Sequence, residues 1–526
     1  MIRLFQVKCA QEKDIEAAIL KKLRIRKEDL LNWHLHRKSV DARHQKVLFS
    51  YVIDVEVRNE KRFLKLKDVH PTPDESYHPV PSGTHELPYR PVVVGFGPAG
   101  MFAALILAQA GYKPLILERG SKVDTRKEKV DTFWNSGKLD EECNVQFGEG
   151  GAGAFSDGKL TTRSKDSLCR KVLEELVRFG AKEEILIDQH PHIGTDAFLK
   201  IIKNIRLEII KLGGEFLFDT KLEDIKVIDN QLTQIKYHNE WIPCRAMILS
   251  CGHSATDTVK MLYNKGVHMS NKPFAVGVRI EHTQDYINQA MLHESWQDER
   301  LIPARYQLTH TARNGKGVYT FCMCPGGYVI ASSSEKEQLV VNGMSYAARD
   351  GKNANSALLV QINESDYGDK MFAGMEYQMA LEKKAYSMAG DYKACVQLAK
   401  DYLKNQVSTG FESVSPTYPL GTTFCDLNEL FSGEVNLALH EALESFEKKV
   451  PGFVENGAIL TAVESRSSSS VRFERDKNCA SNITGIYPAG EGSGYAGGIM
   501  TSAIDGIRCA QNLISYYKKE DYYEVV

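Results

Sequence analysis

The sequence lacks a long hydrophobic run and an excess of charge of either sign. Its 526 residues carry 66 Lys and Arg against 68 Asp and Glu. No overall field therefore favours a nucleic acid or an anionic membrane as partner. The first residues, MIRLFQVKCAQEKD, contain no apolar signal core, and no stretch reaches the length of a membrane span. We therefore expect a cytoplasmic protein with no membrane partner.

Cysteine and histidine also lack the spacing that metal sites or disulfide frameworks need. The 11 cysteines are odd in number and scattered, and the close pair Cys322 and Cys324 has no C-x-x-C motif beside it. Two His-x-His pairs occur, His34 with His36 and His190 with His192, but neither has a third ligand nearby. The sequence therefore assigns no metal.

The strongest pattern present is the stretch Pro91 to Gly120, PVVVGFGPAGMFAALILAQAGYKPLILERG. Val92 to Val94 predicts a strand, Pro98 to Ala110 a buried helix and Lys113 to Leu117 a second strand. The turn between the first strand and the helix has the spacing G-x-G-x-x-G. A strand before this motif and a helix after it are typical of a dinucleotide-binding βαβ unit.

Each glycine of the motif has a physical role. We expect Gly95 to form the tight turn, Gly97 to admit a pyrophosphate and Gly100 to let the helix pack on the strand. Glu118, at the end of the second strand, is placed to accept hydrogen bonds from both ribose hydroxyls and to repel a 2′-phosphate, which favours FAD or NAD(H) over NADP. The remaining candidate contacts of this unit are Pro98, Ala99 and Arg119.

A glycine-rich segment follows, FGEGGAGAFSDGKLTTR from Phe147 to Arg163. Its backbone can lie close to a flat ligand, so Gly150, Gly151 and Ser156 are candidate flavin contacts. Lys159 is a candidate to balance the charge of an anionic reduced flavin. The alternative is a flexible surface loop that carries a surface lysine.

The segments after this loop predict further elements in a characteristic order. Helices are expected over 166–179 and 195–212, a strand over 215–219, a hairpin over 222–237, and a strand over 246–249 that leads to Gly252. This order after a G-x-G-x-x-G motif resembles the FAD domain of the glutathione-reductase type.

Proteins of that type return to the same domain at the C-terminus, and Gly485 to Ala510, GIYPAGEGSGYAGGIMTSAIDGIRCA, has the matching strand, turn and helix. The resemblance implies that Gly490, Glu491 and Gly492 lie by the ribityl and pyrophosphate groups. It also implies that the helix N-terminus at Gly498 and Ile499 faces the N1–C2=O edge of the flavin. The Gly-Glu pair is similar to that of the fumarate-reductase-like branch.

The rest of the chain divides around this domain. We expect a small α/β module at 1–57, a proline-containing linker at 58–90, the FAD-binding domain at 91–270 and 457–526, and an inserted α+β substrate domain at 271–456. The fold class is α/β, with a Rossmann-like domain assembled from discontinuous segments. No second G-x-G-x-x-G flanked by a strand and a helix occurs, which argues against a pyridine-nucleotide disulfide reductase.

The N-terminal module is locally basic. Its strands are expected at Ile2 to Val7 and Val47 to Val57, with a helix at Glu12 to Leu23. The basic residues form either an ordinary solvated surface or a docking face for RNA or an acidic partner; they are Arg24, Arg26, Lys27, Arg37, Lys38, Arg43 and Lys46.

Four runs together resemble a bacterial family of FAD-dependent dehydrogenases or oxidoreductases whose substrate is not defined: FGEGGAGAFSDGKL, FCMCPGG, VESRSSSSVRF and AGEGSGYAGGI. The resemblance implies an FAD enzyme that moves hydride or electron pairs through flavin N5 to or from a small organic substrate, with NADH as a possible transient reductant. Two alternatives stay open. One is a structural FAD beside an RNA- or protein-binding module, and the other is a flavin-dependent hydroxylase.

Outside the FAD domain, four residues are placed near the flavin face: Arg279, Cys322, Cys324 and Arg466. Arg466 either grips a substrate carboxylate or phosphate with its guanidinium fork or bridges two domains. Cys322 and Cys324 are either a redox pair or buried structural thiols. The second interpretation is favoured because alternate residues of a regular strand do not easily meet disulfide geometry.

Overall fold

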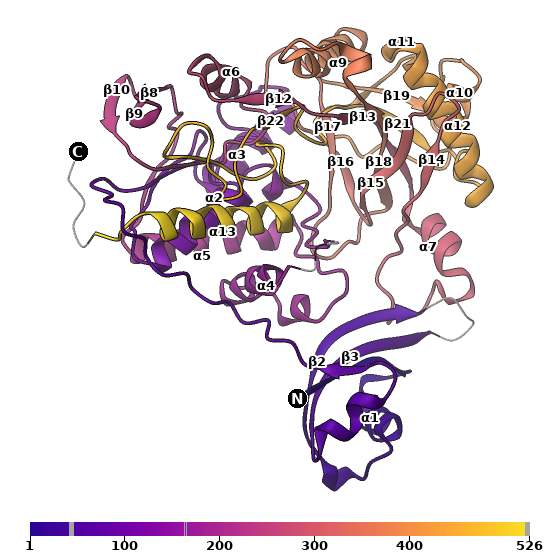
Figure 1. Ribbon diagram of the computed structural model, residues 1–526. Coiled ribbons are helices and arrows are strands. Elements are labelled where there is room, and N and C mark those ends of the chain that lie inside the picture. Colours follow the sequence, from indigo (N-terminus) through magenta and orange to yellow (C-terminus); the bar gives the residue numbers. More distant parts are fainter. Residues whose placement is uncertain (42–46, 163, 165, 521–526) are drawn as a thin grey trace.

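The computed structural model describes residues 1–41, 47–162, 164 and 166–520. Arg43, Lys46 and Arg163, named above, lie outside the described residues. The chain forms a broad body of two regions and a small N-terminal lobe that projects from it (Figure 1). Among the described residues, no helix combines the length and the apolarity that crossing a bilayer requires.

A five-stranded sheet lies at the centre of the first region. All neighbouring strands run parallel, in the order β23-β11-β5-β6-β7. β23 comes from the C-terminal part of the chain, so this is the discontinuous Rossmann-like α/β fold that the sequence predicts. The strands are Val92–Val94 (β5), Leu115–Leu117 (β6), Glu215–Leu217 (β7), Met247–Leu249 (β11) and Ile486–Pro488 (β23).

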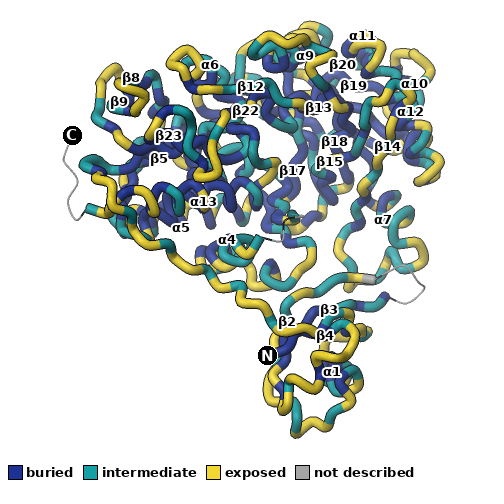
Figure 2. The backbone as a smooth tube through the Cα atoms, viewed as in Figure 1, coloured by how far each residue is buried: buried dark blue, intermediate teal, exposed yellow. Residues whose placement is uncertain are grey.

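Successive residues of β5 face opposite sides of this sheet, because side chains alternate along a strand. Val93 joins the core under four helices, whereas Val92 and Val94 join the core on the other side. The helices are Pro98–Gln109 (α2), Leu168–Arg178 (α4), Thr195–Lys211 (α5) and Ile499–Tyr516 (α13). The other side is covered by Asp224–Ile228 (β8), Gln231–Tyr237 (β9), Glu240–Pro243 (β10) and Thr256–Asn264 (α6). Inside these layers β5, β11 and β23 are buried along their whole length and are dark blue in Figure 2.

The second region is built on a seven-stranded sheet in the order β14-β15-β18-β13-β21-β19-β20. Its strands are Phe274–Thr283 (β13), Thr309–Thr311 (β14), Gly317–Cys324 (β15), Asn353–Ile362 (β18), Ala394–Leu398 (β19), Thr422–Phe424 (β20) and Ile459–Glu464 (β21). Its helices are Gln284–Leu292 (α7), Glu364–Tyr367 (α8), Ala373–Ala389 (α9), Ala399–Leu403 (α10), Leu427–Leu430 (α11) and Gly433–Lys449 (α12). Because β21 pairs with β13 and β19, this sheet continues past the predicted boundary at residue 456.

Three elements connect the two regions. The hairpin of Tyr328–Ala331 (β16) and Val341–Met344 (β17) packs on the seven-stranded sheet. Val123–Ser136 (α3), a helix that the sequence analysis missed, reaches this hairpin through the Trp134 indole, which donates to the Ala331 carbonyl (2.9 Å). A short antiparallel pair, Met269–Asn271 (β12) with Val471–Phe473 (β22), lies where the chain enters and leaves the second region.

The N-terminal lobe is a four-stranded sheet in the order β2-β3-β1-β4, covered by Ile15–Leu23 (α1). The strands are Ile2–Cys9 (β1), Leu30–Asp41 (β2), Leu48–Val57 (β3) and Val69–Pro71 (β4). Because β4 pairs with β1, the lobe extends to Pro71 rather than 57, and the extended connection starts after it. Of the basic residues, Lys27 pairs with Glu16 (2.9 Å) and Lys38 with Glu12 (2.5 Å).

Candidate functional site

A cavity of about 550 Å³ lies at the carboxyl ends of β5, β6, β11 and β23. In open α/β sheets this edge is where ligands bind, because the loops that follow the strands leave a crevice there. The opposite wall comes from the second region, through Phe321 and Cys322 of β15 and Asn342 of β17. The site is therefore shared by the two regions.

Three glycines leave bare backbone on the cavity wall. A Cβ atom added at Gly97 would meet only the Gly151 Cα at 3.6 Å, and at Gly252 or Gly498 it would meet nothing within 4 Å. All three residues line the cavity. Side chains at these positions would fill space that is open for a ligand.

The other two glycines of the motif, Gly95 and Gly100, have roles in the fold, and Gly95 also lines the cavity. A Cβ at Gly100 would collide with the Gly95 carbonyl, and Gly95 itself has a φ of +88°. Gly100 therefore allows α2 to approach the turn, and it does not line the cavity. This is the packing role that the sequence predicts for it.

Two helices begin at the cavity. Gly97 is the N-cap residue of α2 and Gly498 that of α13, and Ile499, Met500 and Thr501 of the first turn of α13 line the cavity. The first N–H groups of a helix have no partners within it, and they carry the positive end of the helix dipole. The site therefore favours negative charge at two places.

Glu118 lies at the end of β6 with its carboxylate almost fully buried. Oε2 accepts from the Phe96 N–H (2.8 Å), and Oε1 accepts from the N–H groups of Gly120 and Gly148 (both 2.9 Å). A carboxylate has about four acceptor positions. Since three are used, Glu118 has room for about one further hydrogen bond, fewer than the two ribose hydroxyls predicted.

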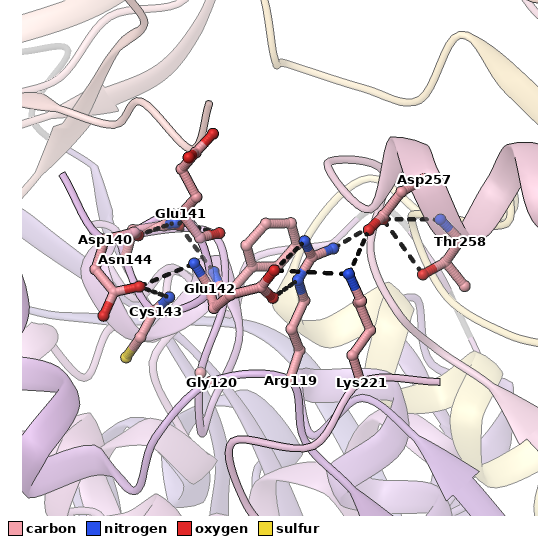
Figure 3. Close-up of polar contacts among 12 residues, drawn as sticks. Arg119, Gly120, Asp140, Glu141, Glu142, Cys143, Asn144, Lys221, Asp257 and Thr258 are labelled. Carbon is pink, nitrogen blue, oxygen red and sulfur yellow. Dashed lines mark hydrogen bonds and ion pairs between the residues drawn. The ribbon is translucent and has the colours of Figure 1, made fainter. Parts of the chain in front are cut away.

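Arg119 forms part of a charge network at the rim of the cavity (Figure 3). Its Nε donates to Glu142 (2.5 Å) and its Nη1 to Asp257 (2.8 Å), while Lys221 lies 3.1 Å from Asp257. The guanidinium also stacks 4.3 Å from the centre of the Phe147 ring. Arg119 is therefore held in place by two carboxylates and by the Phe147 ring.

The glycine-rich loop owes its shape to a residue that the sequence analysis missed. Arg126 of α3 is fully buried and donates to the carbonyl oxygens of Asn144 (2.9 Å), Val145 (2.9 Å), Glu149 (2.8 Å) and Gly151 (2.9 Å). Burial lowers the pKa of Arg126 to about 10. No motif marks this arginine, because its partners are backbone atoms.

Some of the flavin contacts predicted for this loop line the cavity, and one does not. Gly151 and Ser156 line the cavity, whereas Gly150 does not; a Cβ at Gly150 would meet Ile202 of α5. Lys159 lines the cavity as well, where its ammonium donates to the Met323 carbonyl of β15 and lies 3.6 Å from Asp157. The loop therefore connects the cavity with the strand that carries the two cysteines.

Glu491 and Gly492 line the cavity next to Gly490. The carboxylate of Glu491 already has two protein partners: Oε2 lies 2.5 Å from His253 Nδ1 and Oε1 accepts from the Ser469 N–H (2.6 Å). The carboxylate therefore joins the loops after β11 and β21.

Arg279 occupies a different place from the one predicted. It is fully buried in β13 and does not line the cavity. Its Nη2 donates to the Cys322 carbonyl (3.0 Å) and its Nη1 lies 3.5 Å from Glu464. Arg279 therefore supports Cys322 from behind and cannot contact a substrate in the cavity.

Arg466 lines the cavity, but its guanidinium group already binds a carboxylate of the protein. Nε and Nη2 donate to the two carboxylate oxygens of Glu382 in α9, at 2.6 and 2.8 Å. The prediction that this fork grips a substrate carboxylate is wrong, because a bidentate protein partner fills it. The alternative, an arginine that bridges structural units, is the one observed.

Cys322 lines the cavity and Cys324 is buried behind it. The strand is not regular here: β15 has one extra residue opposite β18 between Phe321 and Cys324, and Cys322 has a φ of +44°. This β-bulge interrupts the regular repeat of the strand, and the Cys324 thiol donates to the Cys322 carbonyl oxygen (3.2 Å). The expectation of a regular strand at these two residues is therefore wrong.

His190 and His192 lie behind Lys159. Burial and the nearby arginine and lysine charges lower the pKa of both to about 4. Within the described part of the chain, no three His, Cys, Asp or Glu side chains are grouped as a metal site requires.

Most of the predicted residues therefore meet at one cavity. Gly100, Gly150, Arg279 and Cys324 lie behind its wall. Those that line it are Gly95, Gly97, Pro98, Ala99, Glu118, Arg119, Gly151, Ser156, Lys159, Gly252, Cys322, Arg466, Gly490, Glu491, Gly492, Gly498 and Ile499. Lining residues that the sequence analysis did not single out include Asp157, Lys221, His253 and Asn342. Asp157 could have been found because it belongs to the glycine-rich loop, whereas no sequence pattern marks Asn342.

Comparisons with known proteins match two parts of the chain to family models. Residues 273–467 match the family model described as "FAD-dependent protein, C-terminal domain-like", and residues 1–56 match a domain of unknown function. An uncharacterized protein of Clostridium beijerinckii is 46% identical over 527 residues, which span 98% of this chain and 99% of that protein.

The solved structures that match this chain have low sequence identities and low TM-scores. Glycine oxidase from Bacillus cereus is 10% identical with a TM-score of 0.33, over 82% of this chain and 99% of that chain. L-proline dehydrogenase from P. horikoshii is 12% identical with a TM-score of 0.33, over 82% of this chain and 93% of that chain. Likenesses of this size do not indicate an activity.

Proposed function

The chain belongs to the same family as the Clostridium beijerinckii protein, a family with an FAD-dependent C-terminal domain, and from this premise we propose an oxidoreductase that moves electrons between FAD and a small organic substrate. The observation that carries the proposal is the shared cavity: the βαβ unit forms one wall and the second region forms the other. Its volume of about 550 Å³ lies within the range of cofactor and substrate sites.

The lining fits the parts of FAD in order. The bare backbone at Gly97 and the N-terminus of α2 suit the pyrophosphate, and Glu118 suits the adenosine ribose. The N-terminus of α13 suits the electron-rich edge of the flavin, and the ammonium of Lys159 lies in the same cavity. When bound, FAD supplies a carrier that takes up or gives a hydride at N5.

The protein's own residues then act by binding and charge. The N–H groups at Ile499 and Met500 favour the anionic form of a reduced flavin, because their dipoles are fixed before the reaction. Phe321 and Asn342 of the second region close the opposite side, where the substrate enters and water is excluded. Arg466 positions the loop after β21 and does not bind substrate.

The test is anaerobic addition of NADH to the purified protein, followed by visible absorption. Bleaching of the oxidised flavin bands identifies an NADH-driven reductase or hydroxylase. Bands that stay oxidised with NADH point to an organic electron donor or to a flavin without a catalytic role. Rapid oxygen consumption that requires an aromatic substrate would identify the hydroxylase. A flavin that no donor and no oxidant alters would contradict the proposal.

A further inference from the structure

We propose that Cys322 and Cys324 are a redox-active pair that exchanges two electrons with the flavin and so adds a second electron store to the site. This inference rests on the proposed binding of FAD in the cavity. It depends on four observations: the shape of β15, the position of Cys322, the charges around the two sulfurs and the contrast with another thiol pair.

The shape of β15 removes the separation that a regular strand imposes on these two residues. In a regular strand, residues i and i+2 point to the same face of the sheet. Their Cα atoms lie about 6.6 Å apart along the strand. The bulge between Phe321 and Cys324 and the left-handed backbone at Cys322 interrupt this repeat. The Cys324 thiol donates to the Cys322 carbonyl (3.2 Å), so its sulfur lies against the backbone of Cys322. On this bulge the disulfide closes by a local movement of the two side chains.

A left-handed conformation is uncommon for residues other than glycine, asparagine and aspartate. At Cys322 it lies in the β-bulge of a strand that forms part of the cavity wall. Such conformations persist where surrounding contacts hold them, and they occur at functional sites. Here the Cys322 carbonyl accepts from Arg279 Nη2 (3.0 Å) and the Met323 carbonyl accepts from Lys159.

The same two cations act on the sulfurs. Arg279 Nη2 also donates to Cys324 Sγ (3.6 Å), and Lys159 lies on the cavity side. The hydrogen bond from Cys324 lowers the pKa of Cys322 to about 6, and Lys159 and Arg279 add to this effect. Burial and the same hydrogen bond raise the pKa of Cys324. One thiolate next to one thiol is the state from which dithiols react.

The step balances with oxidised flavin as the oxidant. The Cys324 S–H bond breaks and an Sγ–Sγ bond forms with the Cys322 thiolate. The pair loses two electrons, which reduce the flavin, and the Cys324 proton ends on the anionic reduced flavin. The reverse step uses the same atoms. In air, dioxygen reoxidises the flavin, so Cys322 and Cys324 accumulate as the disulfide.

Another thiol pair provides a control. Cys395 and Cys425 lie with their sulfurs 3.0 Å apart between β19 and the segment after β20, but neither lines the cavity. A short distance between two thiols therefore occurs without access to the flavin. Only the position of Cys322 on the cavity wall couples the pair at β15 to the cofactor.

The experiment is an anaerobic dithionite titration of the FAD-loaded protein as purified in air. The wild type is expected to take up about four electrons per flavin, and Cys322→Ser and Cys324→Ser about two. Cys425→Ser is the matched control and keeps about four. On the wild type alone, alkylation and mass spectrometry before reduction should find Cys322 and Cys324 protected, and after reduction alkylated.

The outcomes separate the two proposals. About two electrons in a wild type that shows flavin bands, with Cys322 and Cys324 alkylated before reduction, would overturn the redox pair and leave the flavin enzyme intact. A loss of the second electron pair in Cys425→Ser but not in Cys322→Ser would also overturn it. A protein with no flavin bands after reconstitution would overturn both.

Discussion

Gly97 is the residue on which cofactor binding depends most directly. The protein itself tolerates a Cβ there, because the nearest atom would be 3.6 Å away, but the side chain would project into the cavity. We expect Gly97→Val to fold and to lose flavin on purification. Gly410→Val is the control, since Gly410 is exposed with open space around it. Equal flavin absorbance in the two variants would contradict this role.

Arg126 tests whether the glycine-rich loop must be held in shape. A lysine has three donors and no fork, so Arg126→Lys leaves several of the loop carbonyls without partners. We expect FAD affinity to fall about tenfold or more, equivalent to about 1.4 kcal/mol, measured by fluorescence titration of the apoprotein. Lys127→Ala, on the exposed side of the same helix, should bind FAD like the wild type. Unchanged affinity in Arg126→Lys would show that the loop keeps its shape without it.

At the scale of elements, the buried pair of Glu382 and Arg466 connects α9 with the loop after β21. Removing one partner of a buried ion pair leaves the other charge uncompensated, at a cost of about 3–5 kcal/mol. We expect Glu382→Gln to lower the melting temperature clearly. Asp131→Asn, which breaks the exposed pair of Lys127 and Asp131, should change stability by less than about 1 kcal/mol. Similar melting temperatures for the two variants would refute the structural role of Arg466.

The elements also show how far the sequence predicts the structure. The βαβ unit and the helix after Gly498 could be predicted because their glycines and apolar runs are local signals. The helix α3 was missed because its few buried residues, Val123, Arg126, Val130 and Phe133, give a weak apolar stripe. The strand β21 was placed outside the second region because its partners are distant in sequence.

At the site, too, the sequence does not predict contacts between residues that are far apart along the chain. Glycines and Glu118 follow a known spacing, but Arg466 and Glu382 are 84 positions apart and nothing local joins them. The bulge at Cys322 depends on a positive φ in a cysteine, which no residue pattern signals. Partners that come from distant segments decided what these side chains do.

At the scale of the whole molecule, buried histidines make stability depend on pH. His282 is fully buried in β13 and hydrogen-bonds the Phe453 carbonyl (2.8 Å), and burial lowers its pKa to about 4. Its pKa rises to about 6.5 on unfolding. The stabilisation is therefore complete above pH 6.5 and is lost as the pH falls towards 4. His190 and His192 act in the same direction.

The variant His282→Gln isolates this contribution, because glutamine retains a donor for Phe453 but does not titrate. Between pH 6.5 and pH 4 we expect the wild type to lose up to about 1.4 kcal/mol more per pH unit than the variant. Melting temperatures at pH 7.5, 6 and 5 measure this difference. A gap between the two proteins that stays constant over this range would contradict a neutral, buried His282.

The central claim is that the cavity shared by the two regions holds FAD. It is tested most directly by incubating the full chain with excess FAD, removing the free cofactor, and identifying and counting the flavin that denaturation releases. The account predicts about one FAD per chain, with little or no retention in Gly97→Val. A wild-type chain that retains no flavin, or retains as much as the Gly97→Val variant does, would contradict it.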